Sequence, residues 1–480
     1  MNRSPVTLRR TLLVVAVFAA LSLSGCSTFS SRNESLRAAY GSANFSAADA
    51  LVDGKIADQA GVKVELVRGS KGLDSAIDPL KNDTLLYLLD KGMTRLAQED
   101  PATALRLFRR SRSALDATFQ ADSAALLKEL ASLFTDDSVR TYKGADYEQL
   151  MVRVMLALSD LITGGGDAYA YAVQIGEKQE EIIGSPLGEI TRDGVDSGYR
   201  PREQYRRIAL GAYLQGVIRE EALERDEAAR AYGRALTISG GSSNLYTTAL
   251  ERVNGKLPSE TGQGALHVFY FGGRGPYLGE TRSNPTDAAI RLAGLAAFLV
   301  TGNVALIAQA PLPVPFVLVN DAHVPPLTVS SDGHVGVTET LLDLNSIARE
   351  QLNANMPWIM ARALLRRSAK AALATVAGRA TVRGTKSDGA GLAVSLFMGL
   401  VSTATENADT RSWETLPATI QAVRLELPAG EQTVRFGNAD ERRIRIAPGR
   451  NSYAIVIHPS GGNPPVILID QYSRRDAVAS

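Results

Sequence analysis

The sequence predicts an α+β protein: an N-terminal tetratricopeptide-like helical array, then a mixed α/β region that ends in a small antiparallel β-sandwich. From about residue 34 to 255, apolar residues recur with the three-to-four residue period of amphipathic helices. Residues 420–472 instead alternate apolar and polar side chains, as half-buried strands do. We therefore expect a helical domain at 34–255, a region of strands and apolar helices at 262–418, and a β-domain at 419–475.

The helical half shows its pattern best in the stretch before and after Asp100. Leu85, Leu89 and Met93 fall on one helix face. Asp100 can cap the free N–H groups of a following helix, and Pro101 fits its first position. The spacing thus predicts two consecutive helices that meet at Asp100.

Two stretches of this half resemble tetratricopeptide repeats. Their small and aromatic positions are Gly92, Ala104 and Phe108 in the first stretch, and Gly216, Ala228, Tyr232 and Ala235 in the second. A middle unit over Tyr147–Lys178 matches less well, with Gly164 beginning its turn. The resemblance implies a concave face that binds a peptide or protein partner. The alternatives are a generic array of helical hairpins, and an array that only spaces the C-terminal half from a membrane.

Residues 262–418 are expected to mix strands with apolar helices. A strand is predicted at Leu266–Phe271, followed by a β-turn at Gly272–Pro276. We do not interpret this turn as a phosphate loop, because no Gly-Lys-Ser/Thr follows it. Ala288–Ala310 and Gly391–Val401 are apolar enough for buried core helices, with membrane-contacting helices as the alternative.

A helical stretch is predicted over Thr338–Ala380, with a second segment beginning at Pro357 and Trp358. Its basic residues lie close together: Arg362, Arg366, Arg367 and Lys370. We interpret them as a solvated face, with binding of anionic lipid or polysaccharide phosphate as the alternative. A flexible loop is expected at Arg383–Gly391.

The N-terminus has the organisation of a secretory signal peptide. Arg9 and Arg10 precede an apolar run, Leu12–Leu23, and small residues stand before Cys26. The ending Leu23-Ser24-Gly25-Cys26 resembles the lipobox of bacterial lipoproteins. This resemblance implies removal of residues 1–25 and acylation of Cys26, and the polar residues that follow predict a tether over residues 26–33. Because no Asp follows Cys26, it also implies the periplasmic face of the outer membrane.

Composition restricts the chemistry of the chain. Cys26 is the one cysteine, so the mature protein is expected to contain no disulfide. Lys plus Arg number 52 and Asp plus Glu number 51, which gives no basic field to attract nucleic acid. The four histidines have no metal-ligand spacing, and no nucleophile elbow, zinc-protease or P-loop motif occurs. We expect no metal, no cofactor and no enzymatic activity.

One segment has the residue types of an interaction site. It runs from Asn407 to Pro417 and contains Asp409, Arg411 and Trp413. Asp409 and Arg411 can form an ion pair, and Trp413 can anchor a seam between domains. The functional alternative makes these three residues, with Trp358, candidates for binding a protein or glycan partner.

This segment, the lipobox, the helical first half and the strand and turn over Leu425–Val434 are similar to a family of uncharacterised Gram-negative outer-membrane lipoproteins. Members are often encoded near activator lipoproteins of penicillin-binding proteins. The resemblance implies an envelope role, in cell-wall assembly, and transfers no catalytic residues. The expected function is a lipid-anchored periplasmic scaffold or adaptor that binds an envelope protein. The alternatives are an enzyme acting on peptidoglycan or another polysaccharide, and an export or assembly component with membrane-contacting helices.

Overall fold

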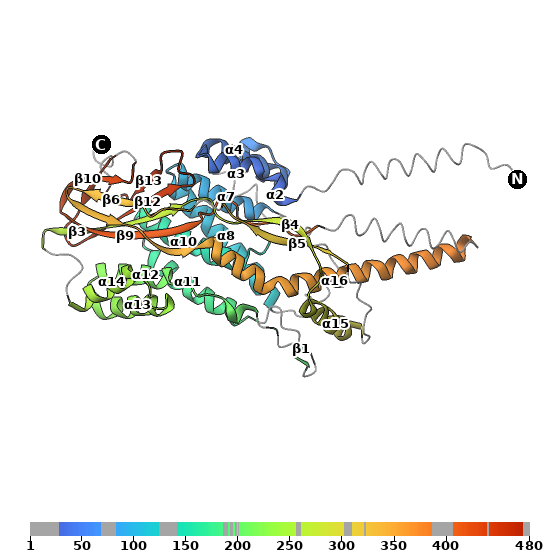
Figure 1. Ribbon diagram of the computed structural model, residues 1–480. Coiled ribbons are helices and arrows are strands. Elements are labelled where there is room, and N and C mark those ends of the chain that lie inside the picture. The colour runs from blue at the N-terminus through green and yellow to red at the C-terminus, as the bar shows by residue number, and fades with distance from the viewer. Residues whose placement is uncertain are drawn as a thin grey trace.

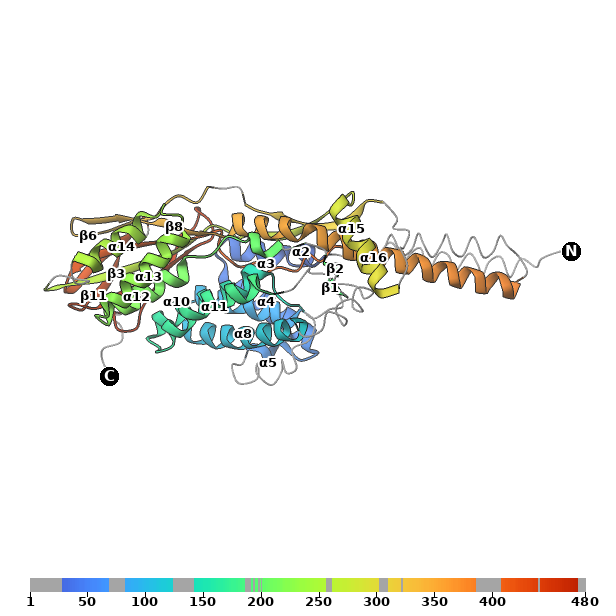
Figure 2. The same cartoon turned by 90° about the horizontal axis from the view of Figure 1, so that it is seen from below.

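The structure, a computed structural model, confirms the mixed α+β class. It describes residues 28–68, 83–123, 142–185, 191–192, 195–196, 199, 201–255, 261–301, 310–320, 323–385, 407–438 and 441–473. The molecule is elongated, with helices and sheets side by side at one end (Figure 1). A single long helix, α16 (Leu344–Thr385), extends from this body in both views (Figure 2).

The N-terminal half is helical, and helices that follow one another in the chain pack side by side. They are α2 (Phe29–Arg32), α3 (Glu34–Gly41), α4 (Phe45–Ala60), α5 (Val64–Arg68), α7 (Thr84–Ala97), α8 (Pro101–Ser123), α10 (Asp146–Thr163), α11 (Ala168–Ile183), α12 (Leu210–Glu221), α13 (Arg225–Ile238) and α14 (Asn244–Gly255). Between α11 and α12 lie β1 (Thr191–Arg192), β2 (Val195–Asp196) and the 3-10 helix η2 (Pro201–Gln204). The predicted boundary at Asp100 is confirmed, since its carboxylate accepts a hydrogen bond from the Thr103 N–H at 3.1 Å.

The glycines of the two repeat-like stretches allow close helix packing. A Cβ on Gly92 would lie 2.3 Å from the Phe108 ring, and one on Gly216 would lie 2.4 Å from the Tyr232 ring. The two contacts join α7 to α8 and α12 to α13 at the same sequence offset. The glycine–aromatic packing is thus present, whereas the assignment to the tetratricopeptide family stays a prediction.

Among the described residues, the strands form two main sheets, the short β1–β2 pair and a separate two-stranded ribbon. The five-stranded sheet has the order β13 (Val466–Ile469), β12 (Asn451–His458), β3 (Gln263–Gly272), β9 (Thr419–Pro428), β8 (Glu339–Asp343). The four-stranded sheet has the order β11 (Arg442–Ile446), β10 (Gly430–Phe436), β6 (Thr328–Ser331), β7 (His334–Val337). The ribbon pairs β4 (Tyr277–Ser283) with β5 (Leu312–Leu318).

This topology corrects the predicted β-domain. The two sheets do pack face to face, but residues 419–475 do not form them alone, because β3, β6, β7 and β8 belong to the same sheets. Nor is the pairing wholly antiparallel, since β12 runs parallel to its neighbour β3. Local alternation identifies each strand, but it carries no information on which distant strand becomes its neighbour.

The central strands are buried on both faces. Side chains such as Val268 and Val423 point to the four-stranded sheet, whereas Phe269 and Ala422 point to the helical layer. One continuous core therefore joins the helices to the five-stranded sheet, and a second core joins the two sheets. The helical and β regions consequently form one body rather than separate domains.

The remaining elements extend the body along α16. The apolar helix α15 (Asp287–Thr301) packs its buried face on α16, as expected of a core helix. Residues 302–309 and the predicted helix at Gly391–Val401 lie outside the described residues, as does most of the loop predicted at Arg383–Gly391. The part of that loop up to Thr385 is helical in α16, so its predicted start is wrong.

Three further predictions about this region are wrong. Residues from Glu339 to Asp343 form β8, because they pair with β9, and the helix begins only at Leu344. Pro357 does not start a new segment but lies inside one continuous helix. Arg366 and Arg367 are 7% and 8% exposed rather than solvated, and Arg367 donates hydrogen bonds to the carbonyls of Ala310 and Pro311.

The predicted tether is also wrong from residue 29 onward, because these residues fold onto the body. Phe29 is buried, and its ring stacks on Tyr87 with centroids 5.7 Å apart. The Ser30 N–H donates to the Thr410 hydroxyl at 3.3 Å. The body therefore begins at α2, and Cys26 itself lies outside the described residues.

Candidate functional site

Residues 407–418 form an extended segment between the helical layer and the sheets, and we call it the inner segment. Every residue from Thr410 to Ala418 is buried. Its far end continues directly into β9, and the Ala418 N–H donates to the Gly272 carbonyl at 3.0 Å. The inner segment therefore packs against the side of the helical array that faces the sheets.

Trp413 is the largest side chain of the inner segment, and it is 0% exposed. Its ring lies 5.9 Å from the ring of Phe108, and its indole N–H donates to the Thr415 hydroxyl at 3.1 Å. Its backbone N–H donates to the Glu148 carboxylate at 2.7 Å. Trp413 thus joins α8 and α10 to the strand that follows it.

Two buried carboxylates of the helical layer hold this backbone. Glu148 also accepts a hydrogen bond from the Ala145 N–H at 2.8 Å, and Asp90 accepts one from the Thr415 hydroxyl at 2.8 Å. Burial raises the pKa of Asp90 to about 7, although the hydrogen bonds from Thr415 oppose this rise. Burial likewise raises the pKa of Glu148. These carboxylates hold the inner segment in place, although burial disfavours their charged form.

The ion pair predicted between Asp409 and Arg411 is present, with the guanidinium 2.7 Å from the carboxylate. Arg411 also lies 3.5 Å from Asp83, which precedes α7. Burial raises the pKa of Asp83, and the Arg411 charge opposes this rise. The pair therefore anchors the start of the inner segment to the helical layer.

These positions decide between the two interpretations of the candidate residues. Trp413 is fully buried and Arg411 is 9% exposed, so neither presents a surface to another molecule. Trp358 is 6% exposed. It packs in a different hydrophobic core from Trp413, the one between α15 and α16. The binding edge predicted from Asp409, Arg411, Trp413 and Trp358 does not form, because three of them are core residues. The seam interpretation describes Trp413 correctly.

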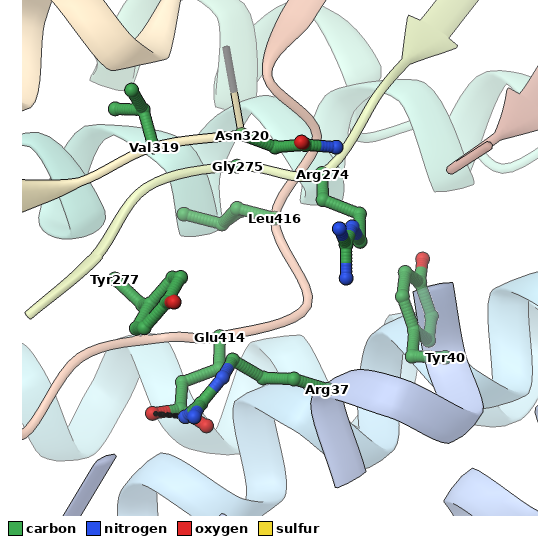
Figure 3. A pocket seen from close by; sticks show the side chains of 9 residues that line it. All are labelled: Arg37, Tyr40, Arg274, Gly275, Tyr277, Val319, Asn320, Glu414 and Leu416. Carbon is green, nitrogen blue, oxygen red and sulfur yellow. Dashed lines mark hydrogen bonds and ion pairs between the residues drawn. The ribbon is translucent and has the colours of Figure 1, made fainter. Parts of the chain in front are cut away.

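A pocket of about 170 Å³ opens beside the inner segment. Figure 3 shows its lining, which comes from α3, the turn between β3 and β4, the start of β4, the residues just after β5 and the inner segment. The lining residues are Arg37, Tyr40, Arg274, Gly275, Tyr277, Val319, Asn320, Glu414 and Leu416. This pocket was not predicted from the sequence.

The floor of this pocket is an ion pair. Arg37 lies 2.8 Å from the Glu414 carboxylate, and its guanidinium lies 4.2 Å from the centroid of the Tyr277 ring. Burial raises the pKa of Glu414 well above its usual value, and the Arg37 charge opposes the rise. The charges of Arg37 and Glu414 therefore compensate each other.

Arg274 enters the same pocket between Leu416 and Tyr40 (Figure 3). It stands in the glycine turn, where Gly273 has a φ of +71° and the Gly275 N–H donates to the Leu416 carbonyl at 2.7 Å. The sequence predicted only a β-turn here. The signal that could have indicated a site is Arg274 itself, a basic residue placed between two glycines in a closely packed turn.

The described ranges contain neither a cluster of metal-ligating side chains nor a candidate membrane-spanning helix. There, no group of three or more His, Cys, Asp or Glu side chains lies in reach of one metal ion. No helix in the same ranges combines the length and the apolar character needed to cross a bilayer.

Comparison of the chain with family models, with curated proteins and with solved structures finds no match.

Proposed function

We propose that the chain is a periplasmic scaffold or adaptor of the cell envelope, anchored in the outer membrane by acyl chains on Cys26 and binding a protein partner. A role in cell-wall assembly fits such a scaffold. The observation that carries the proposal is the docking of α2 onto the body directly after the lipobox-like sequence.

The short distance between Cys26 and α2 fixes how an anchored body would lie. Phe29 is three residues after Cys26, and three extended residues span at most about 10 Å. An acylated Cys26 would therefore hold the α2 end of the body against the bilayer surface rather than on a long flexible stalk. Stable anchoring would come from the several acyl chains that a bacterial lipoprotein carries, since one chain alone binds marginally.

The long helix α16 supplies a surface for a partner. It has 42 residues, passes α2 and continues beyond the body in both views (Figures 1 and 2). After Glu350 its sequence contains no Asp or Glu, and beyond the buried Arg366 and Arg367 it contains the basic residues Lys370, Arg379 and Arg383. Because such a projection carries positive charge close to the anchor, we assign it the contact with an acidic partner at the membrane surface.

The inner side of the helical array is a poorer choice for the partner. Buried Trp413 and Thr415 already occupy it, and displacing them would remove one hydrogen-bond donor from each of the buried carboxylates of Asp90 and Glu148. We therefore place partner binding on α16 and on the outer surface of the array.

The two alternatives receive less support. A polysaccharide-cleaving enzyme needs two acidic groups that face each other. The pocket contributes one carboxylate, Glu414, and Arg37 neutralises it. An export component with apolar membrane helices would leave such helices uncovered, whereas α15 packs its apolar face on α16.

A site-specific cross-linking experiment in cells tests the proposal. A photoreactive residue replaces Thr381 on the projecting part of α16, and in a matched strain it replaces the exposed Glu251 of α14. We expect a discrete protein adduct from position 381 that disappears when Cys26→Ser releases the chain from the membrane. Equal adducts from both positions, or an unchanged adduct in the Cys26→Ser strain, would contradict the proposal.

A further inference from the structure

The pocket beside the inner segment contains an uncompensated positive charge. Arg274 makes no hydrogen bond or ion pair with any of the described residues, and it is only partly exposed. Arg37, the other guanidinium of the pocket, is already bound by Glu414 and by the Ser30 carbonyl at 2.7 Å. With two guanidinium groups and one carboxylate, the lining has one positive charge left over.

Other hydrogen-bonding groups stand near this charge without partners. The Tyr40 hydroxyl and the Asn320 amide line the same pocket, and neither bonds to another group in the described part of the chain. In Figure 3 the Asn320 side chain points toward Arg274, and Tyr40 lies on the opposite side of that guanidinium. A hydroxyl, an amide and a guanidinium can together donate hydrogen bonds to one acceptor group.

The backbone keeps Arg274 in this position. A Cβ on Gly41 would lie 2.5 Å from the Arg274 Cδ, so α3 packs directly against the middle of this side chain. On the other side, a Cβ on Gly275 would lie 2.5 Å from the Leu416 carbonyl oxygen. The guanidinium is therefore held by close packing rather than by an ion pair, as in a preformed binding site.

The geometry points to a binding site for a small carboxylate ligand, in which Arg274 pairs with the carboxylate and Tyr40 and Asn320 complete its hydrogen bonds. A planar guanidinium matches the two oxygens of a carboxylate. The single excess charge of the lining suits a monoanion better than a doubly charged phosphate. The volume of about 170 Å³ fits a group of amino-acid size, with Leu416 and Val319 as the apolar wall.

Such a carboxylate could belong to a free organic acid or to the C-terminus of a peptide, and ligand probes separate these sources. Saturation-transfer NMR on the purified full chain would compare N-acetylalanine, N-acetylalanylalanine, neutral N-acetylalaninamide and inorganic phosphate. We expect both carboxylates to bind, the amide not to bind, and phosphate to bind more weakly. Tighter binding of the dipeptide than of N-acetylalanine would identify a peptide C-terminus, and the reverse order a free acid. Binding of the amide as well as the acid, tighter binding of phosphate, or binding of no probe would overturn the inference.

Variants place the ligand at Arg274. Arg274→Gln should weaken N-acetylalanine binding at least tenfold, because the charge and the bidentate pairing are lost. Arg282→Gln removes the same charge from an exposed position on β4 and should leave binding unchanged. Unchanged affinity in Arg274→Gln, or equal losses in both variants, would overturn the assignment.

A third variant moves Arg274 without removing its charge. Gly41→Ala places a methyl group against the Arg274 Cδ and should lower the affinity for N-acetylalanine several-fold. Circular dichroism and the unfolding midpoint of this variant establish that α3 is intact. Full affinity in a folded Gly41→Ala protein would show that the position of Arg274 is irrelevant. These outcomes are independent of the membrane anchor and of cross-linking from α16.

Discussion

The backbone N–H of Trp413 donates to the carboxylate of Glu148 at 2.7 Å, across 265 positions of sequence. Glu148 belongs to the first turn of α10, and Trp413 lies in the inner segment that leads into β9. This contact connects the helical layer to the sheets at a fully buried point. The two halves of the chain are consequently expected to unfold together.

Loss of the Trp413 side chain should destabilise the whole body. Trp413→Ala removes a 0% exposed ring and leaves a cavity beside Phe108, and we expect the free energy of unfolding to fall by about 3–5 kcal/mol. Urea unfolding, followed both by far-UV circular dichroism and by tyrosine fluorescence, would measure this loss in the free energy of unfolding. Val335→Ala, at a 66% exposed position, is the control and should change stability by less than about 0.5 kcal/mol. A second, unshifted transition for the helices would contradict the single-body description.

The close helix contacts at the glycines can be tested by adding one methyl group. Gly92→Ala should destabilise the protein by about 1–3 kcal/mol, because its Cβ would lie 2.3 Å from the Phe108 ring. Gly54→Ala, inside α4 with no atom within 4 Å of the added carbon, should instead stabilise it by about 0.5–1 kcal/mol. Thermal denaturation of the pair gives the comparison. The same sign for both substitutions would argue against close packing at Gly92.

A buried ion pair in the second half of the array should contribute much more than an exposed one. The Glu220 carboxylate accepts two hydrogen bonds from Arg252, at 2.6 and 2.7 Å, and one from the Tyr232 hydroxyl at 2.5 Å. Glu220→Gln leaves the Arg252 charge buried, and we expect a loss of about 3–5 kcal/mol of stability in chemical denaturation.

The exposed pair of Glu227 and Arg230 is the matched control for that substitution. Glu227→Gln should change stability by less than about 1 kcal/mol. If the two substitutions lowered stability equally, the hydrogen bonds of Glu220 with Arg252 and Tyr232 would have to be exposed to solvent.

Asp90 should make stability depend on pH. Its pKa in the folded protein is raised by burial from 3.8 to about 7, so between these values the folded chain binds a proton that the unfolded chain has lost. The free energy of unfolding should therefore fall as pH rises through this window, by on the order of 4 kcal/mol from this group. Asp90→Asn should flatten the pH profile measured by urea unfolding between about pH 4 and 8. An unchanged slope in this variant would assign the pH dependence to other groups.

Local sequence patterns predicted many of the elements but not how distant elements meet. Alternation located β9 and β11, an apolar run located β3, and capping located the start of α8, because these signals depend on neighbouring residues. The parallel pairing of β12 with β3 could not be predicted, since these strands are separated by more than the whole of α16 in sequence.

The candidate site was likewise predicted only in part from the sequence. The sequence suggested that Trp413 could anchor a seam, but only the structure reveals that Glu148 accepts its backbone N–H and that Asp90 binds the neighbouring Thr415. Arg274 went unnoticed, because its neighbours that make the pocket, Tyr40 and Leu416, come from opposite ends of the chain. A pocket assembled from separate elements has no periodic pattern that a linear sequence could display.

Mass spectrometry of the N-terminal peptide, from native protein extracted from membranes with detergent, tests the central claim most directly. The account predicts a peptide that starts at Cys26 and carries fatty acyl groups on that residue. A peptide that retains any part of residues 1–25, or an unmodified cysteine, would contradict the anchor and with it the orientation assigned to α2 and α16.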